Sequence, residues 1–412
     1  MTDSSNRQVL IAGGGSAGVS VAAALKRARP DLDVALIEPH DKHYYQPGWT
    51  LVGGGAMPQS ATVRDEASLI PAGVEWIRDR VVGFEPDQNR VLLAQRGSIG
   101  YQYLVVALGL QLDWHAVEGL EEALGSNCVT SNYRFDLAPY TWECVRDFKG
   151  GRALFTQPPM PIKCAGAPQK VLYLAADHWR RHGIKADLHF FNQGGAMFGV
   201  PLYAKALDRI MADYGATPHF GHNLIAVNAE RREATFAVGE GDPVTEPFDL
   251  LHVTPPQSAP DVVKQSPLAG AAGWLEVDRN SLQHRRYGNV FGLGDCTDTP
   301  NAKTAAAVRR QFPVVVTNLL AAMAAAGPGN GSYDGYGGCP LTVRNGRVLM
   351  AEFRYDGEVV SSFNADPCVP RRSYWWLKRS FFPFLYWNVM LRGRDWKRPV
   401  ARPRPGKTHP AT

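Results

Sequence analysis

Two cysteines stand in sequence contexts that favour redox chemistry. Cys164 lies in the segment PIKCAGAPQK, and Cys339 lies in the segment GGCP, 175 positions further along the chain. A pair of thiols that meet can exchange electrons by closing and opening a disulfide. No short metal motif contains both residues. The predicted chemistry is therefore thiol–disulfide exchange, provided that the fold brings the two sulfurs together beside a redox cofactor.

The remaining cysteines give no sign of a metal centre. Six cysteines in 412 residues are too few for a disulfide scaffold, and none forms a CxxC motif. No histidine lies at metal-ligand spacing from them, so no metal site is expected. We expect Cys144, Cys296 and Cys368 to be small buried side chains. For Cys128, packing and a chemical role both stay open.

A glycine fingerprint at the N-terminus predicts dinucleotide binding. Gly13, Gly15 and Gly18 form GxGxxG after a strand-like segment, with Ser16 and Ala17 between the last two glycines, and Glu38 follows twenty residues after Gly18. Such glycines permit a tight turn, backbone approach to a pyrophosphate and close helix–strand packing. The helix N-terminus attracts the phosphates, and an acidic residue at this spacing accepts hydrogen bonds from ribose.

These motifs must be positioned by alternating strands and helices. The composition, with 45% hydrophobic and 20% charged residues, is that of a soluble protein of two to three domains. The hydrophobic pattern predicts strands over 8–12, 34–37, 103–108, 152–156, 186–191, 233–238, 250–256 and 347–355, and helices over 19–29, 169–182, 203–214 and 304–325. Pro313 should kink or split the last helix.

The fold class predicted from this order is α/β with two Rossmann-like dinucleotide-binding domains and a C-terminal segment. We expect residues 1–115 and 266–330 to form one nucleotide-binding domain, 116–265 the second, and 331–412 a C-terminal region with the second redox cysteine. Between the strand and helix that open the second domain lies a proline-rich loop holding Cys164, where a second glycine cradle would bind NAD(P)H. The electron donor is therefore predicted not to be a nicotinamide.

Two further motifs resemble those of the two-dinucleotide flavoproteins, the FAD-dependent pyridine nucleotide-disulfide oxidoreductase-like superfamily. Asp295 in GLGDC resembles the second FAD motif, and Gly109 in ALG resembles the middle motif. The resemblance implies FAD as the cofactor, with Asp295 on the ribityl chain.

Longer segments resemble the sulfide:quinone oxidoreductase family, in the branch that includes the mitochondrial enzyme and its bacterial relatives. They span nearly the whole chain: HYYQPGWTLVGGG, PIKCAGAPQK, FNQGGAMFGVP, LLHVTPPQSAPDV, LQHRRYGNVFGLGDCTDTPNAKTAAAV, YDGYGGCPL and PFLYWNVMLRG. The resemblance implies oxidation of hydrogen sulfide to sulfane sulfur and reduction of a membrane quinone. A thiol, sulfite or polysulfide would accept the sulfur. The oligomeric state stays open, with a homodimer among the alternatives.

The resemblance also implies residue roles. Cys164 and Cys339 are the redox pair, with sulfide attacking at Cys339 and Cys164 facing the flavin. Gln46, Gly294 and Lys303 join the FAD-binding set, with Lys303 placing positive charge near the flavin. Lys163 and Lys170 flank Cys164 and could lower the pKa of its thiol.

The C-terminal segment is basic and aromatic. Residues 366–412 hold eleven Lys/Arg against two Asp/Glu, interleaved with Trp, Tyr and Phe. The longest mostly apolar run, 381–391, is too short to span a bilayer, so we expect contact with the lipid interface. A helix buried against the core is the alternative. Nucleic acid is not expected as a partner, because no nucleic-acid-binding motif appears. Phe384, Tyr386 and Trp387 are candidates to line a quinone channel.

The expected location is the cytoplasmic face of the inner or plasma membrane, because MTDSSNRQVLIAGGG shows no secretory or transit leader. Three rival functions stay open. A type II NADH:quinone oxidoreductase would share the fold and the tail, but it needs the second glycine cradle. A sulfide dehydrogenase that reduces a cytochrome would need export. A membrane-docking flavin redox sensor would bind the cofactor without turnover.

Overall fold

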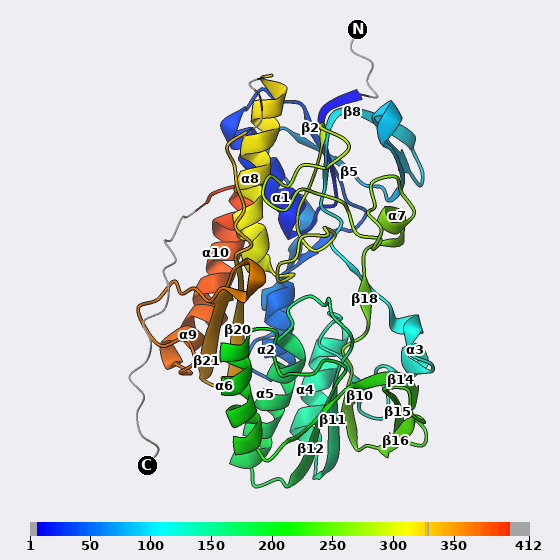
Figure 1. Cartoon of the computed structure of the whole chain (residues 1–412), viewed down its shortest axis with the longest axis vertical. Helices are drawn as coiled ribbons and strands as arrows, with labels where there is room; N and C mark the ends of the chain where they lie inside the picture. The colour runs from blue at the N-terminus through cyan, green and yellow to red at the C-terminus, as the bar shows by residue number, and fades with distance from the viewer. Residues whose placement is uncertain (1–5, 326, 328, 396–412) are drawn as a thin grey trace.

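Two α/β sheets, one above the other in Figure 1, build the protein. The computed structural model describes residues 6–325, 327 and 329–395. The N-terminal fingerprint belongs to the upper sheet, and the segment with Cys164 belongs to the lower one. The predicted α/β class with two Rossmann-like units is confirmed.

The first sheet contains the dinucleotide fingerprint. Its strands, in spatial order, are β5 (Val74–Ile77), β2 (Val34–Ile37), β1 (Asn6–Ala12), β8 (Gly97–Val106), β7 (Arg90–Leu93) and β6 (Val81–Glu85), and β19 (Val290–Gly292) also pairs with β8. The strands from β5 to β8 and β19 run parallel, whereas β7 and β6 are antiparallel. Strand β2 is buried along its whole length, which explains its uninterrupted apolar sequence VALI.

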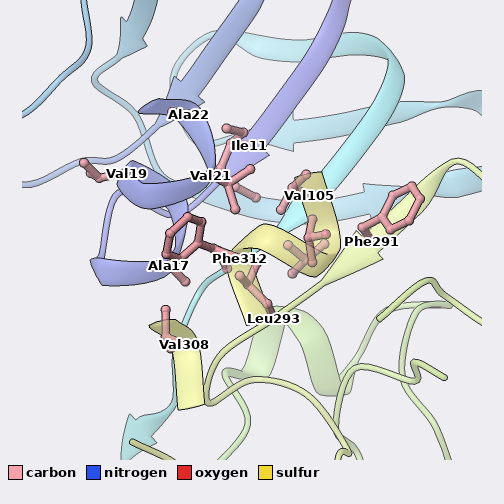
Figure 2. Close-up of a cluster of buried hydrophobic side chains, with 14 of the residues drawn as sticks. Ile11, Ala17, Val19, Val21, Ala22, Val105, Phe291, Leu293, Val308 and Phe312 are labelled. Atoms are coloured by element: carbon pink, nitrogen blue, oxygen red, sulfur yellow. The ribbon is translucent and has the colours of Figure 1, made fainter. Parts of the chain in front are cut away.

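Helices α1 (Ser16–Ala28) and α8 (Ala305–Met323) pack together over this sheet. Figure 2 shows their side chains, with Phe312 of α8 among the residues around Ile11, Val105 and Leu293. The pairing of β19 with β8 returns the chain to the first sheet after the whole second sheet has been built. Distant parts of the sequence therefore share one core.

Helix α8 runs unbroken through Pro313, so of the two predicted effects the split was wrong, and a kink at the proline stays a prediction. Proline removes one hydrogen bond from the helix interior. Tertiary packing outweighs that loss, because Phe312, Val315 and Leu319 are buried in the core shared with α1.

The second sheet is parallel and precedes the return of the chain to the first. Its strands, in order, are β10 (Val129–Thr130), β17 (Leu250–His252), β11 (Gly151–Gln157), β12 (Ala186–Asn192) and β13 (Thr217–Phe220). The helices that accompany it are α3 (Leu120–Ala123), α4 (Leu137–Asp147), α5 (Ala167–Arg181) and α6 (Pro201–Asp213). A separate antiparallel sheet consists of β14 (His222–Asn228), β15 (Glu233–Val238) and β16 (Val244–Pro247), and β15 coincides with the strand predicted over 233–238.

Short elements connect the two sheets. They are β3 (Lys42–Tyr44) with β4 (Val63–Asp65), α2 (Trp49–Gly53), β9 (Gln111–Leu112) with β18 (Gln257–Ser258), and α7 (Asp261–Lys264). The hairpin of β20 (Gly337–Arg344) and β21 (Arg347–Phe353) contacts both α5 and α8. Because this hairpin touches a helix from each unit, it can bring a residue of its own to their junction.

The C-terminal segment lies along one flank of the molecule (Figure 1). It consists of α9 (Arg372–Trp376), a π-helical turn (Leu377–Phe381), α10 (Phe382–Asn388) and a 3₁₀ turn (Met390–Arg392). Tyr386 and Trp387 are each 4% exposed, whereas Trp376 is 57% and Phe384 55% exposed. One side of the segment thus packs on the core, and the other presents aromatic rings to the surroundings.

None of the helices in the described part of the chain has the length and apolar character that a bilayer crossing requires.

Tyr386 fastens the segment to the first sheet. Its hydroxyl lies 2.6 Å from Ser16 Oγ, at the start of α1, and 2.6 Å from His43 Nε2. The other nitrogen of His43 lies 3.0 Å from a carboxylate oxygen of Glu66. This hydrogen-bonded chain ties the C-terminal segment to the glycine fingerprint.

We predict that Tyr386→Phe lowers the free energy of unfolding by about 1–3 kcal/mol, because two polar partners lose a buried hydrogen bond. Urea unfolding followed by circular dichroism measures the change. The control is Phe384→Leu at the exposed side of the same helix, which should stay within about 0.5 kcal/mol of the parent protein. Equal stability of Tyr386→Phe and the parent would contradict the anchoring role.

Candidate active site

The sulfurs of Cys164 and Cys339 lie 3.1 Å apart. Cys164 comes from the loop between β11 and α5, and Cys339 comes from β20. Both are free thiols, and Cys339 is 2% exposed. The fold thus brings together two residues that are 175 positions apart in sequence, at a separation from which a small movement could close a disulfide.

Backbone contacts hold the Cys164 loop against the first domain. The Cys164 N–H donates to the Lys303 carbonyl at 2.9 Å, and the Cys164 carbonyl accepts from Ala167 N at 2.7 Å. Cys164 has a φ of +54°, in the left-handed region that a residue other than glycine rarely adopts. The loop therefore presents its thiol in a conformation that the contact with the Lys303 segment helps to maintain.

Buried cations surround the sulfur pair. Lys170 Nζ, on α5, donates to Cys164 Sγ at 3.0 Å. The hydrogen bond with Cys339 and the charge of Lys170 hold the pKa of Cys164 well below its usual range, although burial opposes them. The same hydrogen bond, together with burial, raises the pKa of Cys339. Cys164 is therefore the sulfur that carries negative charge more readily.

Lys378 is a second buried cation at this site, and the sequence analysis missed it. It lies in the π-helical turn, donates to the Pro340 carbonyl at 2.9 Å, and is 5% exposed. Burial and the charge of Lys170 hold its pKa well below the usual value, while both thiols counteract this. In sequence it is one base among many in the tail, and only its burial distinguishes it.

Lys163 has a different position from the one expected. Its Nζ donates to Gln46 Oε1 at 2.7 Å, and burial lowers its pKa to about 8. The charges that act most on Cys164 are those of Lys170 and Lys378. Of the two flanking lysines predicted to tune the thiol, only Lys170 contacts it. Lys163 instead joins Gln46, a predicted cofactor residue.

The glycine turn has the shape of a phosphate cradle. Gly13 has a φ of +106°, and a Cβ there would lie 2.6 Å from the Ala107 carbonyl oxygen; a Cβ on Gly18 would lie 1.8 Å from the Gly13 oxygen. By contrast, among the described residues no atom beyond the adjoining backbone lies within 4 Å of a Cβ position on Gly15 or Gly109. Tight backbone packing on one side and open space on the other fit the binding of a dinucleotide.

Polar groups around the turn complete this cradle. Glu38 Oε2 accepts from Gly14 N at 2.9 Å, and its other oxygen accepts from the His40 backbone N–H at 3.0 Å. Burial would raise the pKa of Glu38, but hydrogen bonds from His40 and Gly14 lower it overall. The carboxylate stays ionised and retains lone pairs for hydroxyl donors. Ser16 and Ala17 open α1 beside it.

Asp295 follows Gly294, whose Cβ position would lie 3.5 Å from Ala17, and the charge of Cys164 acts on its carboxylate. Within residues 6–325, 327 and 329–395, no donor hydrogen-bonds its carboxylate, and burial raises its pKa. Lys303 Nζ donates to the Asp295 carbonyl at 2.8 Å and to the Thr297 carbonyl at 3.0 Å. Gly294 precedes Asp295 with a φ of +80°. An unpartnered acceptor here fits a hydroxylated cofactor chain, as the resemblance to flavoproteins implies.

The start of α5 is covered by β20. A Cβ on Gly166, which caps the helix, would lie 2.1 Å from Leu341 Cδ2 and 3.0 Å from Cys339 Sγ. In a Rossmann unit, this helix N-terminus is the place for a pyrophosphate. Here the strand that carries Cys339 fills that place.

The remaining predicted residues are distributed as follows. Phe384 is exposed, whereas Tyr386 and Trp387 are buried against His43 and Tyr45. Cys296 is buried as expected. The neighbouring Cys144 thiol lowers the pKa of Cys128 to about 7.

We predict that Lys170→Met raises the pKa of the Cys164 thiol, because a buried cation that stabilises the thiolate is lost. Lys170→Met and its control, Lys163→Met, are both made in a Cys339→Ser background, so that no disulfide forms. Alkylation of Cys164, followed by mass spectrometry over a pH series, should show a midpoint at higher pH. Lys163→Met is the matched control, and a larger shift in that variant would contradict the assignment.

Gly166→Ala should push β20 away from α5, because the added methyl meets Leu341 and Cys339. We expect the formation of the Cys164–Cys339 disulfide by diamide to slow by about tenfold, the effect of roughly 1.4 kcal/mol of overpacking. Mass spectrometry measures the linked peptide. Gly199→Ala, where no atom lies within 4 Å, is the control. Unchanged disulfide formation with Gly166→Ala would refute the tight contact.

Comparison with known proteins agrees with this arrangement. The family model described as pyridine nucleotide-disulphide oxidoreductase matches residues 7–140. The mitochondrial sulfide:quinone oxidoreductase of Mus musculus is 43% identical over 95% of this chain and 88% of its own length, and that of Dictyostelium discoideum is 43% identical over 94% and 86%. The solved sulfide:quinone oxidoreductase of Aquifex aeolicus shares the fold, with a TM-score of 0.77 at 19% identity over 94% of this chain and 92% of that one. The chain therefore belongs to the sulfide:quinone oxidoreductase family.

Proposed function

We propose that the protein oxidises hydrogen sulfide to sulfane sulfur and passes the two electrons through FAD to a membrane quinone. The observation that carries this proposal is the contact of the Cys164 and Cys339 sulfurs at 3.1 Å, next to the segment of Asp295 and Lys303. The names of the relatives at 43% identity support the same reaction.

FAD is favoured among flavins because the chain offers a site for both halves of a dinucleotide. The turn from Gly13 to Gly18, with Glu38, fits a pyrophosphate and an adenosine ribose. The free carboxylate of Asp295 is suited to the hydroxyls of a ribityl chain. When bound, the flavin accepts an electron pair from thiolate and later gives it to quinone.

The two thiols have distinct roles in the proposed reaction. Hydrosulfide attacks Cys339 Sγ in the disulfide form, the bond between the cysteine sulfurs breaks, and Cys164 leaves as a thiolate. A thiol of lower pKa is the better leaving group. The depressed pKa of Cys164 and the contact with Lys170 Nζ at 3.0 Å therefore favour this direction of attack. Cys339 then carries a persulfide.

A nucleophilic acceptor, such as a thiol, sulfite or polysulfide, removes the outer sulfur from Cys339. Both cysteines are then thiolates, and re-forming their disulfide releases two electrons. With a thiol as acceptor, one hydrogen sulfide, one thiol and one quinone give one persulfide and one quinol. Lys170 and Lys378 stabilise the negative charge that collects on the sulfurs.

A nicotinamide donor is not favoured. The helix N-terminus where its pyrophosphate would bind is covered by Leu341 and Cys339, which lie within 3.0 Å of a Cβ position on Gly166. The same contact that brings the sulfurs together therefore argues against a type II NADH:quinone oxidoreductase.

The exposed rings of Trp376, Phe381 and Phe384 support docking at a membrane surface, with quinone entering near Phe384. Tyr386 and Trp387 lie between this surface and the nucleotide fingerprint.

We predict that sulfide alone, added without oxygen, bleaches the flavin absorbance band at about 450 nm. NADH alone should leave this band unchanged. Cys164→Ser and Cys339→Ser should each retain the flavin but lose sulfide:quinone turnover by at least about 1,000-fold, since each cysteine forms a covalent bond in the cycle. Cys368→Ser, partly buried and outside the pair, is the control. Bleaching by NADH, or full turnover in either variant of the pair, would refute the proposal.

A further inference from the structure

A basic pocket lies where the end of α1 meets the end of the C-terminal segment. Its walls carry four cations and no carboxylate, and its volume is about 500 Å³. The residues that line this basic pocket are Ala23, Lys26, Arg27, Leu69, Pro71, Ala72, Asn388, Leu391, Arg392 and Arg394. It lies at the opposite end of α1 from the glycine cradle, so it does not belong to the dinucleotide site.

The cations of the basic pocket form no ion pair with a carboxylate among the described residues. Within the described ranges, the side chains of Arg27 and Arg394 form no hydrogen bond or ion pair with another residue. Arg392 reaches only the Ser68 carbonyl, at 3.5 Å, and Lys26 donates to the carbonyls of Pro30 and Leu32. Positive charge is therefore concentrated here, although the charge of Lys26 also acts on the carboxylate of Asp31.

Neighbouring residues reinforce this charge. Burial and the charge of Arg392 lower the pKa of Arg64, which stacks on Trp387 at 4.5 Å. Asp395 follows Arg394 directly in sequence, and its carboxylate interacts electrostatically with Arg309. Cations that crowd together in a cavity of this size are a suitable site for a phosphate group.

The basic pocket adjoins the exposed aromatic face. Asn388, which lines it, donates to the carbonyl of Phe384, one helical turn earlier. Phe384 is 55% exposed, and the stacked rings of Phe381 and Trp376 lie beyond it. An apolar face next to a phosphate-sized basic cavity matches a phospholipid, whose acyl chains and headgroup are similarly arranged.

We infer that the basic pocket binds the phosphate of an anionic phospholipid headgroup while the neighbouring aromatic rings enter the acyl region. The pocket would give the docked protein a preference for anionic membranes and a fixed orientation. This inference concerns the membrane contact within the proposed function. Its test measures vesicle binding and not turnover, so the inference about the membrane contact and the proposed function can fail separately.

The test uses the full-length, flavin-loaded protein in co-sedimentation with vesicles of phosphatidylcholine, alone or mixed with phosphatidylglycerol. The parent protein should bind the mixed vesicles roughly 100-fold more tightly than vesicles of phosphatidylcholine alone. The triple variant Arg27→Gln/Arg392→Gln/Arg394→Gln should lose roughly 100-fold of the binding to mixed vesicles, from about fivefold per cation near the surface. Its binding to phosphatidylcholine alone should stay unchanged.

Two controls separate the basic pocket from general charge attraction. Lys205→Gln/Arg209→Gln/Arg231→Gln removes the same number of exposed charges from the other unit and should bind as the parent does. Ala72→Trp fills the basic pocket without changing charge and should lose binding to mixed vesicles by at least tenfold. Equal flavin content and thermal midpoint show that each variant is folded.

Three results would overturn the inference. They are equal binding of the parent protein to both vesicle types, unaltered binding of Ala72→Trp, and an equal loss in the two triple variants. Titration calorimetry with inorganic phosphate distinguishes the source of the ligand. Binding of free phosphate by the parent protein, combined with no preference between vesicles, would assign the basic pocket to a soluble anion and refute a lipid ligand.

Discussion

The structure depends on one constraint: two sulfur atoms from distant parts of the chain must meet at the junction of two Rossmann-like units. The Cys164 loop is bound through its backbone to Lys303 of the first unit, and β20 brings Cys339 against the N-terminus of α5 in the second. The absence of a side chain at Gly166 makes this close approach sterically feasible. The contact that brings the two sulfurs together also covers the helix N-terminus at which a Rossmann unit holds a pyrophosphate.

Two buried lysines determine the electrostatics of the Cys164–Cys339 sulfur pair. Lys170 and Lys378 are both removed from water near the two sulfurs, where their field acts more strongly than it would at the surface. A thiolate offsets the cost of burying an ammonium group, and the ammonium group stabilises the thiolate. The asymmetry between a low pKa at Cys164 and a high one at Cys339 gives the two sulfurs different chemistry, although both are cysteines.

The C-terminal segment contacts the interior on one side and is exposed at the surface on the other. Lys378 reaches the sulfur pair, Tyr386 reaches the start of α1, and Phe384 points away from the core. The buried side of the segment agrees with the expected helix against the core, whereas contact of its exposed side with lipid stays a prediction.

Local pattern alone determined much of this protein. The apolar runs, the glycine spacing and Glu38 predicted the first Rossmann unit, and β2 and β15 have the predicted bounds, because short-range sterics and burial govern these features. The pattern also marked Cys164 and Cys339 as candidates. Only the tertiary structure decided that their sulfurs meet, that Lys170 and not Lys163 contacts the thiol, that Lys378 joins them, and that α8 continues through Pro313. These outcomes depend on contacts between residues far apart in sequence, which packing of the whole chain establishes and no local spacing encodes.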